Sequence, residues 1–356
     1  MNDATVTEAF VTRVMDDMSG GMVSIMCALG DQLGLFRALA EQGPADSAGL
    51  ATRTGLDERY VREWLLCLSS AGYLTVGKAD EEGRERFILP PEHAAVLAFE
   101  ESPFFIAGAA RLVPALSMML DGVTEGFRSG GGLTPEQYPE SLYRTMWQMS
   151  ASWLDSLLLP QWVPAVDGLA RALEDGTRVA HVGSGGGRAL VLLAGRFPRS
   201  RFVGYDRLRL NVERARRAAQ EAGVADRVEF VEADAREALS GEHGLIMSFD
   251  VLHDAPDPGG TLRAVRSALA PGGVFLLLES NGVDRAVENT GSGAALLYGA
   301  SVLYSVPITR AGEGPSLGML GLPPGTLRTL CEEAGLTSVR PMPSPTPFNA
   351  LYEIRP

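Results

Sequence analysis

Cysteine, histidine and lysine are scarce in this sequence. Three of its 356 residues are cysteine, four are histidine, and Lys78 is the only lysine. The cysteines, at positions 27, 67 and 331, lie far apart and lack C-x-x-C spacing, which favours reduced core thiols over disulfides. The histidines lack the spacing of metal ligands and no acidic cluster accompanies them, so we predict no metal site.

Long apolar runs are also missing. No stretch of about 18 consecutive apolar residues occurs, which excludes a membrane-spanning helix by that measure. The first ten residues carry two acids and no basic residue ahead of an apolar segment, unlike a secretory signal peptide. We therefore predict a cytoplasmic protein with no membrane partner.

Positive charge is in deficit. The chain has 31 Lys and Arg against 44 Asp and Glu, a net charge of −13. An acidic surface repels phosphate backbones, so we predict no nucleic-acid partner. The 46% hydrophobic content is ample for a sizeable core, and the length suits two domains.

The first hundred residues have the pattern of helices followed by a strand pair. Apolar residues recur at helical spacing over residues 22–40, and Gly43-Pro44 ends that run. Ser47 and Asp57 are N-cap residues for two shorter helices, and two apolar segments (73–76 and 87–89) then flank a polar turn. This order is typical of a winged helix, which we assign to residues 1–100 as a dimerisation domain.

A winged helix raises the hypothesis of a transcriptional regulator. Residues 1–100 carry 8 basic and 16 acidic side chains, and the recognition helix has Asp57, Glu58 and Glu63 against Arg59 and Arg62. A DNA-binding surface needs the opposite balance. We therefore expect this domain to pack against a second copy, forming a homodimer, or against the rest of its own chain.

Two further segments are rich in apolar and aromatic residues. Residues 101–165 are predicted to be a helical linker, and residues 281–320 a lid insertion. Core packing accounts for most such side chains, but small-molecule pockets are also apolar and favour domain boundaries. The substrate-pocket candidates are Met146, Trp147, Tyr298 and Tyr304.

From residue 166 onward, short apolar strands alternate with helices. The strands are RVAHV, RFVGY, RVEFVE, LIMSF and VFLLLE, and segments with helical periodicity separate them. Such alternation predicts an α/β domain whose parallel sheet is covered on both faces. We assign this domain to residues 166–356.

The first of these strands runs into a glycine-rich turn at residues 183–187. Glycines allow a ligand to approach the backbone, and the following helix N-terminus presents free N–H groups. Asp206 ends the second strand, where an acid binds ribose hydroxyls in nucleotide-binding folds, and Asp234 follows the third. No third glycine stands at Arg188 and no P-loop lysine exists, so a nucleoside without pyrophosphate fits better than a dinucleotide.

Four segments in this order carry a resemblance: VAHVGSGGGRALVLLAGRFPRSRFVGYD, VEFVEADA, SFDVLHDAPDP and LAPGGVFLLLES. Together they resemble the class I S-adenosylmethionine-dependent methyltransferases with an N-terminal winged-helix domain, which act on hydroxyl groups of small molecules. VLHDAPDP is similar to the LHDW segment of plant and bacterial O-methyltransferases, and LPPEHAAVL is similar to one bacterial branch. The resemblance implies a Rossmann-like seven-stranded sheet and S-adenosylmethionine as cofactor, with S-adenosylhomocysteine as product.

The resemblance also implies roles for individual residues. Gly183 and Gly185 would line the methionine moiety, Asp206 the ribose, and Asp234 with Ala235 the adenine, while His253 would be the general base. We add four neighbours of these positions to the cofactor candidates: His181, Ser184, Arg207 and Asp250.

His253 also suits the role of base on chemical grounds. It follows the fourth strand, at the sheet edge where ligands of such folds lie. An imidazole with a pKa of about 6.5 accepts a hydroxyl proton near neutral pH. Glu279, which ends the fifth strand, would orient or polarise it, whereas Asp254 is expected to point away and cap the next turn.

Two positions depart from the family pattern. His181 and Gly244 stand where the family usually has acids. We expect the absence of these two acids near a cationic ligand to weaken cofactor binding. The main prediction is methyl transfer to a hydroxyl of a hydrophobic small molecule in specialised metabolism. A non-methylating enzyme on the same fold (a cyclase, isomerase or decarboxylase) that uses or has lost the cofactor is the first alternative, and a regulator the second.

Overall fold

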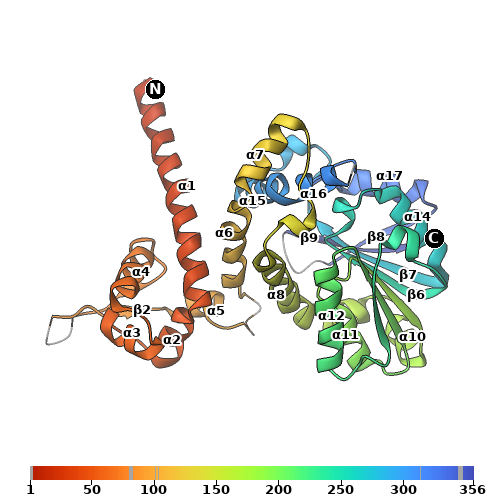
Figure 1. Ribbon diagram of the computed structural model, residues 1–356, viewed down its shortest axis with the longest axis horizontal. Helices are drawn as coiled ribbons and strands as arrows, with labels where there is room; N and C mark the ends of the chain where they lie inside the picture. The colour runs from red at the N-terminus through yellow and green to blue at the C-terminus, as the bar shows by residue number, and fades with distance from the viewer. Residues whose placement is uncertain (1–2, 80–82, 101, 103, 313, 344–347) are drawn as a thin grey trace. The chain divides into compact units, whose positions relative to one another are not determined.

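The computed structural model describes residues 3–79, 83–100, 102, 104–312, 314–343 and 348–356. The chain divides into two compact units (Figure 1). The first comprises residues 1–115 and 144–152, and the second residues 116–143 and 153–356. Of the predicted segments, the polar turn of the strand pair includes residues 80–82 and the lid includes residue 313, which lie outside the described residues.

The first unit is a winged helix preceded by a long helix. Its elements are α1 (Asp3–Gln32), α2 (Leu35–Gln42), α3 (Ser47–Thr54), α4 (Glu58–Ser70), β1 (Thr75–Val76), β2 (Phe87–Ile88), α5 (Pro91–Leu97) and η1 (Ala107–Arg111). The two strands pair antiparallel. Leu50, Leu65 and Leu68 are fully buried in its core, where Phe36 packs edge-on against Trp64 with ring centroids 5.1 Å apart.

Two details of this unit correct the sequence prediction. The helix expected over residues 22–40 is two helices, because Gly34 adopts a left-handed backbone (φ 70°) that ends α1 and begins α2. The N-cap of α3 is Asp46, whose carboxylate accepts the Gly49 N–H at 2.7 Å, and Ser47 is the first helical residue. The predicted cap at Asp57 is confirmed, since its carboxylate accepts the Arg59 N–H at 3.0 Å.

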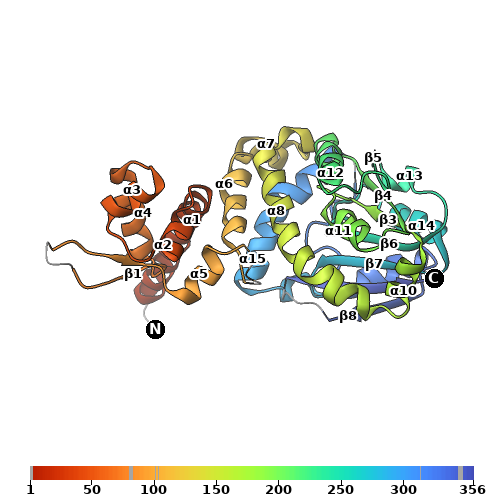
Figure 2. The same cartoon turned by 90° about the horizontal axis from the view of Figure 1, so that it is seen from below.

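The second unit is built on a seven-stranded sheet with strand order β5-β4-β3-β6-β7-β9-β8 (Figure 2). The first five strands in this order are parallel, and β9 runs antiparallel to both of its neighbours. The strands are β3 (Arg178–Val182), β4 (Arg201–Asp206), β5 (Val228–Glu232), β6 (His243–Phe249), β7 (Leu269–Ser280), β8 (Ser338–Met342) and β9 (Asn349–Arg355). The predicted Rossmann-like architecture is therefore confirmed.

Helices cover both faces of this sheet. One face of β3 buries Val179 with residues of α10 (Leu169–Asp175), α11 (Arg188–Arg196) and α12 (Arg209–Glu221). The other face buries Ala180 and Val182 with residues of α13 (Ala235–Ala238), α14 (Pro258–Ala268) and α17 (Pro324–Glu333). Alternate residues of one strand thus enter opposite cores, as the near-continuous apolar strands require.

The remaining helices come from the two segments rich in aromatic residues and from the loop after β6, which forms η4. They are α6 (Leu112–Ser117), α7 (Leu120–Ser129), η2 (Pro135–Gln137), α8 (Glu140–Leu157), η3 (Leu158–Trp162), α9 (Val163–Ala165), η4 (Leu252–Asp254), η5 (Ala286–Glu288), α15 (Gly291–Ala300), η6 (Ser301–Ser305) and α16 (Val306–Ala311). Both η3 and η6 are π-helical turns, which occur frequently at functional sites.

One helical stretch is long and apolar enough, by length and composition, to cross a membrane. Residues 291–311 reach a mean hydropathy of 1.2 over an 18-residue window, with only 17% of that window buried, and α1 joined to α2 passes the same test as a bent pair. Mean hydropathy over a window is a less strict criterion than an unbroken apolar run. By this criterion, the exclusion of a membrane-spanning helix that was made from the sequence does not hold. Length and composition alone are weak evidence for a membrane span.

Candidate cofactor and catalytic site

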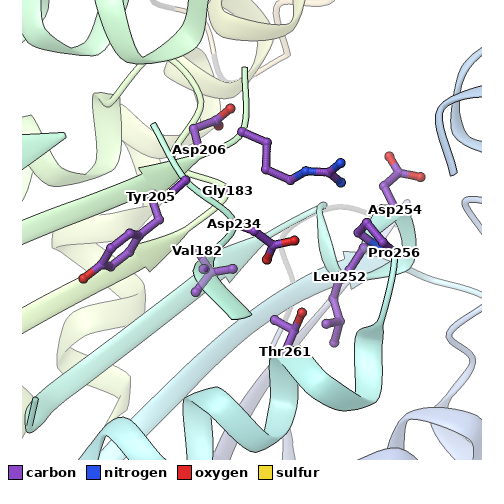
Figure 3. Close-up of a pocket in the computed structure, with 13 residues that line it drawn as sticks. Val182, Gly183, Tyr205, Asp206, Asp234, Leu252, Asp254, Pro256 and Thr261 are labelled. Atoms are coloured by element: carbon purple, nitrogen blue, oxygen red, sulfur yellow. The ribbon is translucent and has the colours of Figure 1, made fainter. Parts of the chain in front are cut away.

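A pocket opens in the second unit at the carboxyl ends of the parallel strands, beside the point where the strand order reverses between β3 and β6. Ligands of doubly wound folds bind at this point. The pocket has a volume of about 100 Å³, enough to enclose one part of a nucleoside-sized ligand. Its wall consists of Val182, Gly183, Tyr205, Asp206, Arg207, Ala233, Asp234, Ala235, Leu252, Asp254, Ala255, Pro256 and Thr261 (Figure 3).

The glycine turn brings the backbone directly to this wall. Gly183 has a φ of 68°, and a Cβ added there would lie 2.5 Å from Cγ1 of Val251. No side chain fits at this position, so the strand end remains open to a ligand. Of the predicted turn residues, Gly183 lies on the wall, whereas Ser184 and Gly185 stand behind it.

Asp206 is held rigidly at the end of β4. Its Oδ2 accepts the Gly185 N–H at 2.8 Å, and its Oδ1 accepts the Leu208 N–H and the Asn211 side-chain amide, both at 3.0 Å. Burial raises the pKa of this carboxyl, and the three donors oppose the shift. The predicted ribose-binding acid therefore ties the glycine turn to the start of α12.

The other predicted nucleoside contacts also lie on the wall. Asp234 caps α13 by accepting the Arg236 N–H at 2.9 Å, and Ala235 and Arg207 flank the same space. Figure 3 shows Asp206 and Asp234 following their strands, with Asp254 on the loop after β6. Three carboxylates and one guanidinium of the described residues thus surround the pocket.

His253 and Glu279 form a buried pair at the carboxyl ends of β6 and β7. Nδ1 of His253 lies 2.6 Å from Oε2 of Glu279, and the other oxygen of Glu279 accepts the Leu252 N–H at 2.8 Å. His253 is 1% exposed and Glu279 is fully buried. The structure therefore brings the two predicted catalytic residues into contact.

Asp254 does not point away from His253, contrary to expectation. Its Oδ2 lies 3.4 Å from Nε2 of His253, so both ring nitrogens face carboxylates. Burial alone would lower the pKa of His253, but Asp254 and Glu279 raise it well above its usual value. The α14 cap is Asp257, whose carboxylate accepts the Gly260 N–H at 2.7 Å.

Asp250, a predicted cofactor residue, lies in this cluster rather than on the pocket wall. Its backbone is left-handed (φ 53°), and both carboxylate oxygens accept the Asn349 side-chain amide, at 2.9 and 2.8 Å. Burial, together with the charge of Glu279, raises the pKa of Asp250 to about 7. A non-glycine residue held in this conformation is strained, which is common at functional sites.

His181 is turned into the core. It is 4% exposed, and its ring lies 5.0 Å from that of Phe249, which also packs against Trp153 and Trp162. Within the described part of the chain, neither ring nitrogen has a hydrogen-bond partner, nor does Oγ of Ser184. Burial lowers the pKa of His181 to about 3, so the ring is neutral.

Gly244 does not lie near the pocket, contrary to expectation. It lies near the amino end of β6, where a Cβ would come 2.4 Å from Oγ1 of Thr177. The glycine turn stands at the carboxyl ends of the strands, so an acid at position 244 would not meet a ligand in the pocket. The structure therefore gives no support to the expectation that the missing acid at position 244 weakens cofactor binding.

The four residues predicted to line the substrate pocket lie in different surroundings. Tyr304 donates a hydrogen bond to Tyr143 and packs edge-on against Tyr138, with ring centroids 5.1 Å apart. The negative charge of Asp254 helps to raise the pKa of Tyr304. Tyr298 instead donates to the Ala286 carbonyl at 3.0 Å and is 38% exposed. Met146 and Trp147, on α8, belong to the first unit.

Sequence reasoning missed several residues of this region. Tyr205 precedes Asp206 directly, and Leu252, Ala255 and Pro256 lie within the singled-out VLHDAPDP segment, so proximity to those motifs was an available signal. Asn349 had none, because it meets Asp250 from a strand 99 residues away. Among the described residues, no group of three or more His, Cys, Asp or Glu side chains is arranged to hold a metal ion.

Comparison with family models matches both parts of the chain. Residues 21–99 match the Rv2258c-like winged HTH domain, and residues 173–301 match a methyltransferase domain. The chain thus carries a winged HTH domain followed by a methyltransferase domain, and it is an S-adenosylmethionine-dependent methyltransferase. The predicted enzyme class, fold and cofactor are thereby confirmed.

Relatives of this methyltransferase support the same grouping. It is 28% identical to acetylserotonin O-methyltransferase of Mus musculus over 296 residues, which is 75% of this chain and 72% of the relative. It is 36% identical to trans-aconitate 2-methyltransferase of Streptomyces coelicolor over 118 residues, which is 32% of this chain and only 39% of that enzyme.

Solved structures share the fold of this methyltransferase over nearly its full length. Mitomycin 7-O-methyltransferase MmcR matches with a TM-score of 0.69 and 20% identity, covering 99% of both chains. Human N-acetylserotonin methyltransferase in complex with S-adenosylmethionine matches with a TM-score of 0.67 and 18% identity, covering 97% of both.

The residues of the pocket fit an adenosyl cofactor. Gly183 leaves the strand end free of any side chain, a carboxylate stands at the end of β4, and the wall is acidic enough to accept a cationic ligand. Asp206, Asp234 and Ala235, which the resemblance predicts to contact the nucleoside, all line this pocket.

Proposed function

We propose that this methyltransferase transfers a methyl group from S-adenosylmethionine to a hydroxyl of a hydrophobic small molecule. The observation that carries the proposal is the buried His253–Glu279 pair beside the pocket at the carboxyl ends of the parallel strands. The bound cofactor supplies an electrophilic methyl group on a positively charged sulfur. The protein then has to align the acceptor oxygen with that methyl group and remove the acceptor's proton.

The cofactor would be held mainly by the glycine turn and the strand-end acids. Gly183, Asp206 and Asp234 are proposed as direct contacts, with Arg207 and Ala235 beside them on the wall. Gly185 acts through the N–H that it donates to Asp206, and Ser184, His181 and Asp250 stand behind the contact layer. His253 is proposed as the general base that takes the acceptor's proton, and Glu279 as the residue that orients its imidazole.

The hydrophobic acceptor is inferred from the tyrosines and from the relatives. Tyr138, Tyr143 and Tyr304 gather in the second unit, and the charge of Asp254 acts on Tyr138 and Tyr304. Two of the compared proteins are named as O-methyltransferases of small molecules. We therefore propose an acceptor from specialised metabolism. The net charge of −13 supports a protein without a nucleic-acid partner, and a cytoplasmic location without a membrane partner stays a prediction.

A homodimer formed through the first unit is part of the proposal. Residues 4–20 of α1 form an unbroken exposed run. Phe10, Val14 and Met18 recur along it every four residues, and Phe10 and Met18 are each more than 60% exposed. A stripe of this length on one helix is typical of an interface.

The proposed function is tested by binding and turnover. Calorimetry with S-adenosylmethionine and S-adenosylhomocysteine should show binding of both, and mass spectrometry of reactions with a panel of phenols and alcohols should show products 14 mass units heavier, the mass of a CH₂ group. Absence of binding by either compound contradicts the proposal. Binding without any methylated product favours the non-methylating alternative.

A further inference from the structure

Asp250 directly follows β6 and has an unusual backbone conformation. Its φ is 53°, and among the described residues Ser316 is the only other non-glycine residue with a positive φ. A residue with a Cβ is strained in this conformation, and such strain persists only where neighbouring contacts hold it. The contacts around Asp250 therefore decide the direction in which the chain leaves the strand.

Two strands hold Asp250 in place. Its backbone N–H donates to the Leu278 carbonyl of β7 at 2.8 Å, and its carboxylate reaches the first residue of β9. There the Asn349 side-chain amide donates to Oδ1 at 2.9 Å and to Oδ2 at 2.8 Å, so both carboxylate oxygens have a donor. Because β7 lies between β6 and β9, this contact bridges the end of the strand that carries Glu279.

The three residues that follow this left-handed turn all reach the site. Val251 lies against the glycine turn. The Leu252 N–H donates to Oε1 of Glu279 at 2.8 Å, and Nδ1 of His253 lies 2.6 Å from Oε2. A carboxylate accepts and does not donate, so Nδ1 carries the proton and this hydrogen bond fixes the orientation of the imidazole. Each of these contacts depends on the direction of the chain after β6.

We propose that Asp250 and Asn349 are positioning residues for the general base. The amide–carboxylate contact holds the left-handed backbone at Asp250, and that turn directs His253 toward Glu279. The inference rests on the proposed function, in which His253 takes the acceptor's proton. Neither Asp250 nor Asn349 lies on the pocket wall, so both act through His253 rather than on the ligands.

The first test reads the position of His253 and needs no turnover. In full-length protein labelled with ¹⁵N-histidine, the proton between Nδ1 and Glu279 should give a far-downfield NMR resonance, because this 2.6 Å hydrogen bond is short and charge-assisted. The loss of the resonance in His253→Gln assigns it. Asn349→Ala should abolish the resonance, whereas Asp57→Ala, a helix-cap change in the first unit, should keep it. An unchanged resonance in Asn349→Ala overturns the proposal.

The second test exchanges the two side chains, and it also decides the matter where truncation at position 349 prevents folding. Asn349→Asp alone sets two carboxylates against each other, and it should abolish the resonance and lower kcat about 10- to 100-fold, the scale of a misplaced catalytic group. The double variant with Asp250→Asn again pairs an amide with a carboxylate, and Asn also adopts the left-handed backbone. It should regain the resonance and a kcat within about threefold of wild type.

Two outcomes of the exchange overturn the proposal. One is a kcat for Asn349→Asp that stays within about threefold of the wild-type value with the resonance in place. The other is a double variant that recovers neither the resonance nor the rate, because the two side chains would then not act through their mutual contact.

The two levels of inference fail differently. If calorimetry shows no binding of S-adenosylhomocysteine, the proposed function fails, while the resonance of His253 still reports whether Asp250 and Asn349 position the imidazole. If the cofactor binds and phenols are methylated at the wild-type rate by Asn349→Ala, the proposed function stands and the positioning role is wrong.

Discussion

His181 is a neutral imidazole in a fully buried aromatic cluster. Burial lowers its pKa to about 3, against about 6.5 in an unfolded chain. Between pH 3 and pH 6.5, His181 is protonated in the unfolded state and neutral in the folded state. Acidification below pH 6.5 therefore lowers the free energy of unfolding. At pH 5.5 the penalty from this one group is about 1.4 kcal/mol.

Replacing His181 with Phe should remove that penalty. Relative to its own value at pH 7.5, the free energy of unfolding of His181→Phe should fall about 1.4 kcal/mol less at pH 5.5 than that of the wild-type protein. Urea unfolding at both pH values measures the difference. Parallel pH profiles for wild type and His181→Phe would show that the buried ring is protonated after all.

Gly183 is the residue on which the shape of the pocket depends most directly. An Ala there must adopt a left-handed backbone and overlap Val251, which should cost about 3 kcal/mol and weaken S-adenosylhomocysteine binding. Gly195, inside α11 with no atom within 4 Å of its would-be Cβ, is the matched control. Gly195→Ala should stabilise the protein by up to about 1 kcal/mol, and calorimetry should find its affinity unchanged. Equal affinities for both variants would contradict the placement of Gly183.

At the scale of elements, the parallel strands could be predicted from the sequence and the first helix could not. Short apolar strands separated by helical periodicity specify a covered sheet, and the structure confirms β3 to β7. Residues 4–20 of α1 are all exposed, so no core-facing stripe in the sequence marks the helix start. The break at Gly34 was missed because the apolar period continues across it.

The candidate site was predictable where it depends on strand ends and not where it depends on side-chain direction. His253 follows β6 and Glu279 lies near the end of β7, and the carboxyl ends of these neighbouring parallel strands meet at one edge. Asp254 was placed wrongly because consecutive residues usually diverge, whereas the tight turn of η4 lets this carboxylate reach back to the imidazole.

Asp57 gives a test of an element boundary that the sequence did predict. Its carboxylate accepts the Arg59 N–H at 3.0 Å and the Tyr60 N–H at 3.4 Å at the start of α4. Asp57→Ala should destabilise the helix by about 1 kcal/mol. Hydrogen exchange at the first amides of α4 should accelerate about fivefold, while amides of α11 in the other unit keep their rates. Unchanged exchange in α4 would mean that the cap contributes nothing.

At the scale of the whole molecule, the exposed face of α1 predicts self-association. The double variant Phe10→Glu with Met18→Glu places two charges on the apolar stripe and should shift sedimentation from dimer to monomer. Thr12→Glu, an exposed position on the opposite side of the helix, should leave the dimer intact. A monomeric wild-type protein at micromolar concentration would contradict the proposed assembly.

The carboxylate of Asp206 is anchored by three donors before any ligand arrives. A nucleoside that docks against it need not order a loop or choose a rotamer, so little conformational entropy is lost on association. Capture should then be limited by diffusion and orientation rather than by rearrangement of the receptor. The hydrogen bond between Asp206 and the glycine turn should therefore favour a high association rate of the cofactor.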